Sequence, residues 1–266
     1  SARAMRVLQE VDCIAAEDTR HTGQLLRHCG IQTPLLSLHE HNERARLGQV
    51  IGLLREGKAI ALVSDAGTPL ISDPGFPLVR ELRRQGLKVI PVPGPSSLLA
   101  ALSVARLPTD RFGFEGFLPA KSAARRERLQ ALAGEERTLV FLEASHRVAE
   151  TLVDLAATFG GDRPAVVARE LTKRFEEVQS DTLTGLVNWL AADPLRSKGE
   201  FVLLTQGAAP AGETDSPEIR RLLTILLAEL PTSRAVAVAA KYTGLRKKPL
   251  YELALTLGGR QPAEAS

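Results

Sequence analysis

The sequence has 266 residues, of which 44% are hydrophobic, 24% are charged and 4% are aromatic. That composition is typical of a globular protein with an aliphatic core, and no apolar run approaches the roughly 20 residues of a membrane span. The formal net charge of +3, from 34 basic and 31 acidic residues, is too small to attract a polyanion, so such a partner would have to meet local basic patches.

The N-terminus and the cysteines suggest the compartment. The first residues, SARAMRVLQEVD, carry charges where a signal peptide has its apolar segment, so we expect no export. Cys13 and Cys29 form neither a CxxC pair nor another metal-ligand spacing. Cys13 stands in the apolar run VDCIAA and is expected in the core. We therefore predict a cytoplasmic protein without a membrane anchor or a metal site.

The first hundred residues alternate between short apolar runs and segments with helical spacing. The alternation favours an α/β fold in which parallel strands are covered by helices. The predicted strands are VDCIAA, PLLSL, AIALVSD and LKVIPV, and the predicted helices include Glu43 to Arg55 and Phe76 to Gln85. Loops after parallel strands gather at one edge of the sheet, where open α/β sheets bind ligands.

Two of these loops have the composition of a binding wall. VSDAGTPLISDPG, Val63 to Gly75, follows a predicted strand and combines acids with small residues, which let a ligand approach the backbone closely. PGPSS brings backbone donors and the hydroxyls of Ser96 and Ser97 to the start of a helix. We expect both loops to line a ligand cleft.

Two further strand ends are polar. AAEDTRHT, Ala15 to Thr22, and VVARELTK, Val166 to Lys173, each close an apolar run with charged side chains. Either one alone could be an ion-paired strand end, but four polar strand ends in one chain favour a shared cleft. GLLREGKA is not a P-loop, because Ala59 stands where a P-loop has Ser or Thr and the segment precedes a strand instead of following one. No GxGxxG occurs, and HEHN is interpreted as a polar loop.

The second half of the chain repeats the alternation and then changes. LPTDRFGFEGFLP is interpreted as a hinge, and TLVFLEA, PAVVAREL and EFVLLTQ are predicted strands, with helices from about His146 and from Leu183 to Ala192. GAAPAGETDSP, Gly207 to Pro217, has the composition of a linker. Three helical patterns follow, at 217–230, 232–242 and 249–257, and the turn YTGLRKKP gives them a helix-turn-helix-like character.

Basic residues form separate clusters that could follow a phosphate backbone. The first contains Lys121, Arg125, Arg126 and Arg128, the second Arg169, Lys173 and Arg174, and the third Arg246, Lys247 and Lys248. Any one of them could be an ordinary solvated face. Aromatic residues are scarce near them, so base-stacking platforms are not indicated.

The motifs IAAEDTRHTGQLL, HEHN, ALVSDAGTPLISDPG, VPGPSSLLAAL, LPTDRFGFEGFLP, ARELTK and KGEFVLL occur in this order. In sequence and order they resemble the 16S rRNA cytidine 2'-O-methyltransferases of the tetrapyrrole methylase superfamily, over nearly the whole chain. The resemblance implies two α/β domains, 1–108 and 109–207, with a cofactor cleft between them and a helical appendage at 208–266. It also implies S-adenosylmethionine as cofactor, 16S rRNA or the small ribosomal subunit as partner, and a homodimer.

The resemblance also implies roles for individual positions. The cofactor-binding set is Asp65, Ala66, Gly67, Thr68, Pro69, Ile71, Ser96, Ser97, Leu142, Glu143, Ala144, Ala168, Glu170, Gly199 and Phe201. Candidates for activating or orienting the ribose hydroxyl are Glu17, Asp18, Arg20 and Glu170. The RNA-binding set is Lys121, Arg125, Arg126, His146, Arg147, Lys173, Lys247 and Lys248.

One departure from the family pattern concerns the N-terminus. The family begins with a strand and a proline- and glycine-containing loop, and this sequence starts inside the helix that follows them, at ARAMRVLQ. Without that strand we expect a smaller first sheet and a cleft that lacks one lip.

Two other functions stay open. A tetrapyrrole methylase of the same fold would have no need of basic faces or of the segment 208–266. A non-catalytic RNA-binding or assembly protein would have no need of the acid-rich motifs AAEDTRHT and SDAGTPLISDPG.

Overall fold

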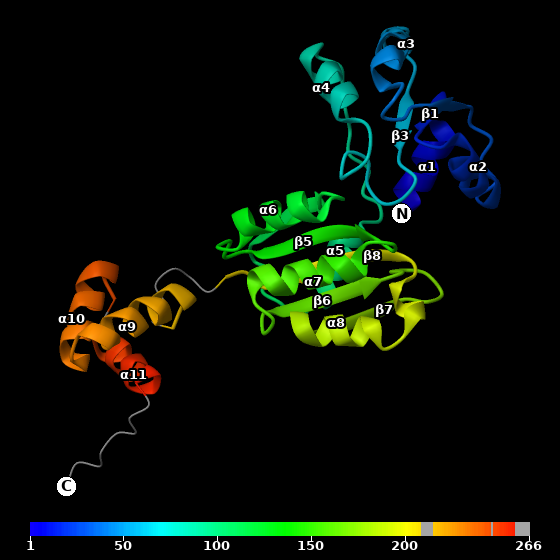
Figure 1. Ribbon diagram of the computed structural model, residues 1–266. Coiled ribbons are helices and arrows are strands. Elements are labelled where there is room, and N and C mark those ends of the chain that lie inside the picture. The colour runs from blue at the N-terminus through cyan, green and yellow to red at the C-terminus, as the bar shows by residue number, and fades with distance from the viewer. Residues whose placement is uncertain (209–214, 246, 259–266) are drawn as a thin grey trace. The chain divides into compact units, whose positions relative to one another are not determined.

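The computed structural model describes residues 1–208, 215–245 and 247–258. Contacts group the chain into two compact units, residues 1–130 with 138–205, and residues 131–137 with 206–266. The first unit contains a three-stranded and a five-stranded sheet (Figure 1). The described part of the chain has no helix long and apolar enough to cross a bilayer.

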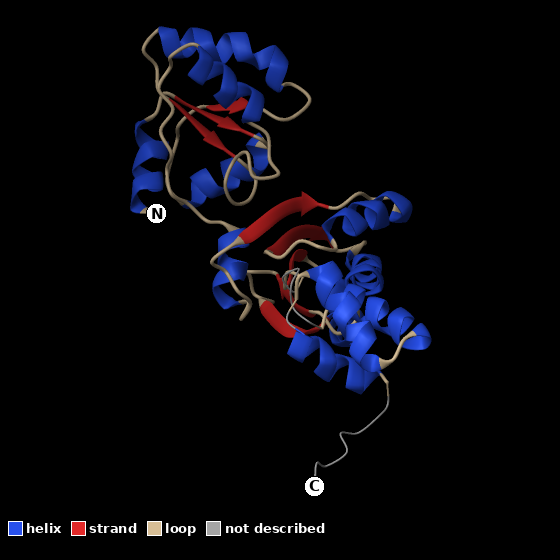
Figure 2. Ribbon diagram, turned by 90° about the vertical axis from the view of Figure 1, so that its left-hand side faces the viewer, coloured by secondary structure: helices blue, strands red, loops and turns tan. Residues whose placement is uncertain are grey.

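The first sheet is parallel, with the strand order β2-β1-β3. Its elements are α1 (Ala2–Glu10), β1 (Cys13–Ala16), α2 (Thr19–His28), β2 (Leu35–Ser37), α3 (Glu43–Arg55), β3 (Ile60–Val63) and α4 (Phe76–Arg84). Successive side chains of β1 point to opposite faces, as in any strand. Ile14 packs with Leu26 of α2 on one face, and Ala15 packs with α3 and α4 on the other. Helices therefore lie on both sides of the strands (Figure 2).

The second sheet is mixed, with the order β4-β5-β8-β6-β7. Its elements are β4 (Phe112–Phe117), α6 (Ser122–Leu132), β5 (Thr138–Ala144), α7 (Val148–Phe159), β6 (Pro164–Arg169), β7 (Glu177–Thr182), α8 (Leu183–Ala191), the 3-10 turn η1 (Pro194–Ser197) and β8 (Glu200–Thr205). Helices α7 and α8 lie over one face (Figure 1). Helix α5 (Ser97–Val104) covers the other, where Ala101 and Leu102 pack on Val140, Val166 and Leu204.

Helix α5 follows the first sheet in the chain and yet belongs to the core of the second. Its buried face is made of small and aliphatic side chains that meet alternate residues of β5, β6 and β8. This packing brings Ser96, at the end of the preceding loop, and Ser97, at the start of α5, to the ends of β5, β6 and β8, and so it positions the site.

The structure corrects two predictions, the strand at 87–92 and the hinge at 107–119. The run 87–92 is not a strand in the described structure; Leu87 and Val89 still pack in the core, but Pro91 has no N–H to donate to a ladder. In the second sheet, for which no strand direction was predicted, β4 and β5 run parallel and the other neighbouring pairs are antiparallel.

The predicted hinge 107–119 contains strand β4. Gly116, with φ +65°, marks a register shift in the pairing of β4 with β5, and such a glycine-containing bulge makes a strand resemble a loop in sequence. Strand β7 was not predicted, because EVQSDT is polar and lies at the sheet edge.

The described residues of the second unit form the helices α9 (Pro217–Glu229), α10 (Thr232–Thr243) and α11 (Lys247–Leu257), close to the three predicted ranges. Their core is formed by Leu223, Val236, Ala239, Leu250 and Leu253 with their neighbours. Gly244, in the left-handed conformation, ends α10. The predicted linker lies largely at 209–214, outside the described residues, as does Arg246 of the third basic cluster.

Candidate active site

The loop between β3 and α4, residues 64–75, is held in an uncommon backbone conformation. Leu70 and Ser72 have φ of +74° and +64°, values that cost free energy for residues other than glycine and cluster at functional sites. Gly75 has φ +123°, and a Cβ there would lie 2.7 Å from a methyl carbon of Leu62. Glycine is therefore required at the end of this loop.

The ends of β1 and β3 are joined by reciprocal hydrogen bonds. The Asp18 amide donates to Asp65 Oδ1 at 3.0 Å, and the Asp65 amide donates to Glu17 Oε2 at 3.2 Å. Asp18 also caps α2 through the amides of Arg20 and His21, and the Arg20 guanidinium pairs with it at 2.8 Å. The Arg20 contact holds the pKa of Asp18 well below its usual range, so Asp18 is a poor proton acceptor.

A second loop lies against the first. The Thr68 hydroxyl donates to the Pro95 carbonyl at 3.0 Å, and Ser96 caps α5 by accepting from the Leu99 amide at 3.4 Å. The loop 64–75 also meets β4, because a Cβ at Gly116 would lie 3.1 Å from Ser72 Oγ. The cofactor loops predicted from two distant parts of the sequence are thus in contact.

The end of β5 carries a buried carboxylate. Glu143 is 2% exposed and accepts from the Thr151 hydroxyl at 2.6 Å, from its neighbour's amide, that of Ala144, at 2.8 Å, and from Arg147 at 3.2 Å. A buried charge is tolerated when it is paired and hydrogen-bonded in this way. Glu143 therefore stiffens the turn that leads from β5 to α7.

The ends of β6 and β8 are fastened together. Glu170, with φ +50°, accepts from the Glu200 amide at 2.9 Å and donates its own amide to the Glu200 carbonyl at 2.9 Å. The hydrogen bond that the Glu170 carboxyl accepts from the Glu200 amide lowers the pKa of that carboxyl. Lys173 bridges Glu170 and Glu200 at 3.1 and 3.0 Å. Gly199 has φ +107°, and a Cβ there would lie 2.5 Å from the Glu170 side chain.

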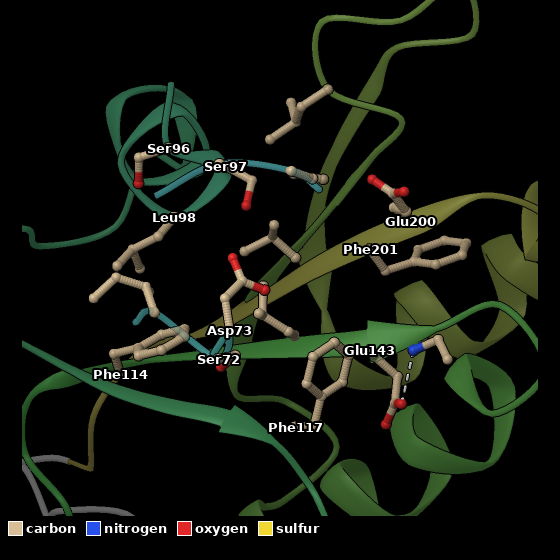
Figure 3. Close-up of a pocket in the computed structure, with 18 of the residues that line it drawn as sticks. Ser72, Asp73, Ser96, Ser97, Leu98, Phe114, Phe117, Glu143, Glu200 and Phe201 are labelled. Atoms are coloured by element: carbon tan, nitrogen blue, oxygen red, sulfur yellow. Dashed lines mark hydrogen bonds between the residues drawn. The ribbon is translucent and has the colours of Figure 1, made fainter. Parts of the chain in front are cut away.

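These segments surround a cavity of about 420 Å³, within the range usual for small-molecule sites. Its lining is mostly apolar, with hydroxyls and carboxyls interspersed (Figure 3). The lining residues are Ala66, Gly67, Thr68, Ile71, Ser72, Asp73, Ser96, Ser97, Leu98, Phe114, Phe117, Leu142, Glu143, Ala144, Ser145, Ala168, Leu171, Gly199, Glu200, Phe201 and Val202.

Asp73 differs from the other carboxylates of the cavity wall. Glu143 is paired with Arg147 and Glu200 with Lys173, whereas Asp73 has no basic partner among the described residues. Burial raises the pKa of Asp73, with Glu17 and Asp65 adding to the rise and a hydrogen bond with Ser64 opposing it. Figure 3 shows its carboxyl group pointing toward the side of the cavity where Ser97 lies.

The family follows from a comparison with known proteins. Residues 1–187 match the model of the Tetrapyrrole (Corrin/Porphyrin) Methylases, which is more than half of the chain. The protein belongs to the tetrapyrrole methylase family. A second model, described as an RsmI C-terminal HTH domain, matches residues 213–258. The helical segment that follows the methylase part is therefore a domain type of its own.

Curated relatives of this methylase cover nearly the whole chain. A protein of Pseudomonas aeruginosa named Ribosomal RNA small subunit methyltransferase I is 55% identical over 98% of this chain and 93% of its own length. Proteins of the same name are 57% identical in Xylella fastidiosa, over 94% of this chain and 92% of theirs, and 49% identical in Escherichia coli O157:H7, over 97% and 90%.

Solved structures agree on the fold. A cobalt precorrin-4 methyltransferase of cobalamin biosynthesis aligns with a TM-score of 0.56 and 19% identity, over 77% of this chain and 88% of that one. A uroporphyrin-III-C-methyltransferase from Thermus thermophilus gives 0.55 and 22%, over 77% and 87%. The predicted α/β class with a helical appendage is confirmed.

The methylase cavity brings together most of the predicted cofactor residues. Twelve of them line it: Ala66, Gly67, Thr68, Ile71, Ser96, Ser97, Leu142, Glu143, Ala144, Ala168, Gly199 and Phe201. Asp65, Pro69 and Glu170 do not line it; Asp65 and Glu170 instead fasten the strand ends behind it. Whether these residues bind a cofactor stays a prediction.

Several lining residues were not predicted, among them Ser72, Asp73, Phe114 and Phe117. Asp73 belongs to the same loop motif as Asp65, so the second acid of SDAGTPLISDPG was the available signal. Phe114 and Phe117 lie in the segment interpreted as a hinge, where no sequence signal separated them from a connector.

The four predicted catalytic residues, Glu17, Asp18, Arg20 and Glu170, lie outside the cavity lining. The structure places each in a hydrogen-bond network that joins strand ends or caps a helix. Within the described residues, no group of three or more His, Cys, Asp or Glu side chains is arranged to hold a metal ion.

The predicted RNA-binding residues are of three kinds: exposed, partly exposed but paired, and buried. Lys121, His146, Lys247 and Lys248 are exposed, and Arg126 is 61% exposed at its side chain. Lys173 is held by carboxylates, and Arg147 is bound to Glu143 and to the Leu118 carbonyl.

The structure removes Arg125 from the predicted RNA-binding residues. Its side chain is 1% exposed and pairs with Asp154 at 2.7 Å and with Glu150 at 3.2 Å. A guanidinium buried and paired in this way is not available to RNA phosphates. Arg125 therefore joins α6 to α7 and is removed from the proposed RNA surface.

Proposed function

We propose that the protein is an S-adenosylmethionine-dependent methyltransferase that methylates the 2'-hydroxyl of a cytidine ribose in 16S rRNA. The observation that supports this best is the meeting of loops 64–75 and 93–97 with the ends of β5, β6 and β8 around one cavity. The relatives that are 46–57% identical to this chain carry the rRNA methyltransferase name, whereas the two tetrapyrrole methyltransferase structures compared above are 19% and 22% identical.

The cavity fits a sulfonium nucleoside by size and chemistry. Phe114, Phe117 and Phe201 provide aromatic surface for a purine, and Ser96 and Ser97 provide hydroxyls for a ribose or an amino-acid group. Asp73, without a basic partner among the described residues, would balance a positive charge. When bound, S-adenosylmethionine supplies a methyl group activated on a sulfonium sulfur.

The chain's contribution is positioning and proton removal. Holding donor and acceptor in line can lower a barrier by about 7–11 kcal/mol, and the fastened strand ends around Glu170 and Asp65 give the walls the rigidity this needs. The ribose hydroxyl must lose its proton as the oxygen–methyl bond forms. Asp73 is the cavity carboxylate best suited to accept it, because burial raises its pKa above the usual range and no basic side chain among the described residues is paired with it.

The RNA would be held outside the cavity by exposed basic side chains. We propose Lys121, Arg126 and His146 in the first unit and Lys247 and Lys248 in the second, whereas Lys173 is paired with Glu170 and Glu200. Phosphate contacts of this kind position RNA without reading its sequence. We further propose that the protein acts in the cytoplasm as a homodimer.

The decisive experiment is a methylation assay. The purified protein is incubated with labelled S-adenosylmethionine and small ribosomal subunits from a strain that lacks the modification, and the labelled nucleotide is mapped. We expect label on the 2'-oxygen of one cytidine of 16S rRNA. Label on a base, or none on RNA while a tetrapyrrole is methylated, would contradict the proposal.

The cavity is tested by a filling variant. Ala66 is exposed and lines the cavity, so Ala66→Trp should obstruct it without disturbing the core. Ala124→Trp, at an exposed position of α6 outside the lining, is the matched control. In calorimetry, Ala66→Trp should lose S-adenosylmethionine binding and Ala124→Trp should keep it. Equal binding by both would show that the cofactor binds elsewhere.

A further inference from the structure

The loop of residues 170–176 joins β6 to β7 (Figure 1). Only Leu171 of this loop lines the proposed cofactor cavity. The loop therefore begins at the cavity, and residues 172–176 are all exposed. Hydrogen bonds from the Lys173 amide to the Glu170 carbonyl, at 2.9 Å, and from the Glu176 amide to the Lys173 carbonyl, at 3.2 Å, fold it into consecutive turns.

The base of this loop is held firmly. Lys173 is bound to both Glu170 and Glu200, and Glu200 itself lines the cavity. Thr172 has φ +67°, uncommon for a β-branched residue, and its amide donates to Glu176 at 2.5 Å. Strain of this kind persists only where surrounding contacts fix it, and it is concentrated at ligand clamps.

The second turn presents an aromatic ring and a cation together. The Phe175 side chain is 65% exposed, and the Arg174 guanidinium lies over its ring at 5.5 Å from the centroid. Arg169 and Lys173 of the same segment are paired with carboxylates. In the described structure Arg174 has no carboxylate partner, so its charge is available to an anion.

We propose that Phe175 and Arg174 form a platform for an unpaired nucleotide of the substrate RNA, with the ring stacking on the base and the guanidinium meeting a phosphate. Recognition of RNA commonly uses aromatic side chains on which unstacked bases lie, together with arginine. The platform lies four residues from a cavity-lining residue, so it would hold a nucleotide beside the one that is methylated. The inference rests on the proposed function and deepens it, and it replaces the expectation from sequence that no base-stacking platform lies near the basic clusters.

The test separates stacking from simple apolar contact by the choice of residue at one position. Phe175→Trp keeps an aromatic face, Phe175→Leu keeps apolar volume without one, and Phe175→Ala removes both. Loss of one stacked base costs about 1–3 kcal/mol, or about 5- to 150-fold in affinity. We expect kcat/KM for small subunits to fall by about that factor in the leucine and alanine variants, mainly through KM, and to be retained in the tryptophan variant.

Two controls exclude a general effect of surface substitution and a loss of cofactor binding. Val153→Ala removes another exposed apolar side chain, 52% exposed and outside the cavity lining, and should leave kcat/KM unchanged. Binding of S-adenosylmethionine, measured by calorimetry, should be the same in all variants, because Phe175 does not line the cavity. Activity in the wild type establishes the function independently of this inference.

A direct readout is the fluorescence of Phe175→Trp, compared with the wild type, whose only tryptophan is Trp189. Stacking predicts extra quenching by a single-stranded RNA of 16S sequence and none by the same RNA as a duplex. The inference is overturned if Phe175→Ala matches the wild type in kcat/KM. It is also overturned if Phe175→Leu is as active as Phe175→Trp, a result that would indicate a protein contact.

Discussion

At the scale of single residues, Asp73 is a carboxyl group whose environment opposes its charge. Burial, Glu17 and Asp65 raise its pKa, so the folded protein binds this proton more tightly than the unfolded chain does. The stability that Asp73 contributes is therefore full below its unfolded pKa and is lost as the pH rises through the folded pKa. At neutral pH the charged Asp73 side chain therefore lowers the free energy of unfolding.

Replacing Asp73 by asparagine should accordingly stabilise the fold at neutral pH and impair methylation. We expect a higher urea midpoint than wild type at pH 7 and a difference that shrinks as the pH approaches about 4, near the unfolded pKa. The same variant should lose about 10²–10⁴-fold in kcat, the usual contribution of a positioned base. If the stability gain of Asp73→Asn grew as the pH was lowered, the Asp73 pKa would not be raised in the folded protein.

Arg125 and Arg126 are neighbours in sequence with opposite environments, 1% and 61% exposed at their side chains. Arg125→Met should lower the free energy of unfolding by about 3 kcal/mol, because Asp154 would stay buried without its main partner. Arg126→Met should cost at most about 1 kcal/mol, as for surface ion pairs, and should weaken RNA binding. Urea unfolding and RNA filter binding measure the two effects; equal stability of both variants would contradict the assignment.

At the scale of elements, the first turn of α2 shows how a catalytic-looking motif can be structural. Asp18 accepts hydrogen bonds from two amides at the start of α2 and ties it to β3 through Asp65. A carboxylate, an asparagine or a serine can cap a helix, whereas alanine cannot.

We predict that Asp18→Ala lowers the urea midpoint while Asp18→Ser largely keeps it, and that Asp18→Ser retains methylation. The lowered pKa of Asp18 makes it a weak proton acceptor, so its replacement by a hydroxyl should not remove the base. If Asp18→Ser folds like the wild type and yet loses turnover as fully as Asp18→Ala, Asp18 takes part in the chemistry after all.

At the scale of the whole molecule, every cavity-lining residue belongs to the first unit and the helices α9–α11 belong to the second. A chain ended after Gln206 should therefore bind S-adenosylmethionine as the full chain does. It should bind small-subunit RNA more weakly. The magnitude of the slope of log affinity against log salt should fall by about 1.4–1.8, since each of Lys247 and Lys248 would account for about 0.7–0.9. An unchanged slope would remove those lysines from the RNA surface.

The sequence alone determined much of the local structure, because hydrophobic periodicity and turn residues act over short range. The ranges of β5, β6, β8 and α9–α11, and the polar loops after the strands, follow from that pattern. The motif order pointed to the family, and with it to most of the residues that line the cavity.

Which of these residues lie together depends on the packing of the folded chain. The packing of α5 on the second sheet carries Ser96 and Ser97 to β5 and β8, an encounter between segments more than forty residues apart that no local pattern encodes. The burial of Arg125, the isolation of Asp73 and the exposure of Phe175 have the same origin. Charge and exposure depend on what packs beside a residue, and that is settled by the assembled core.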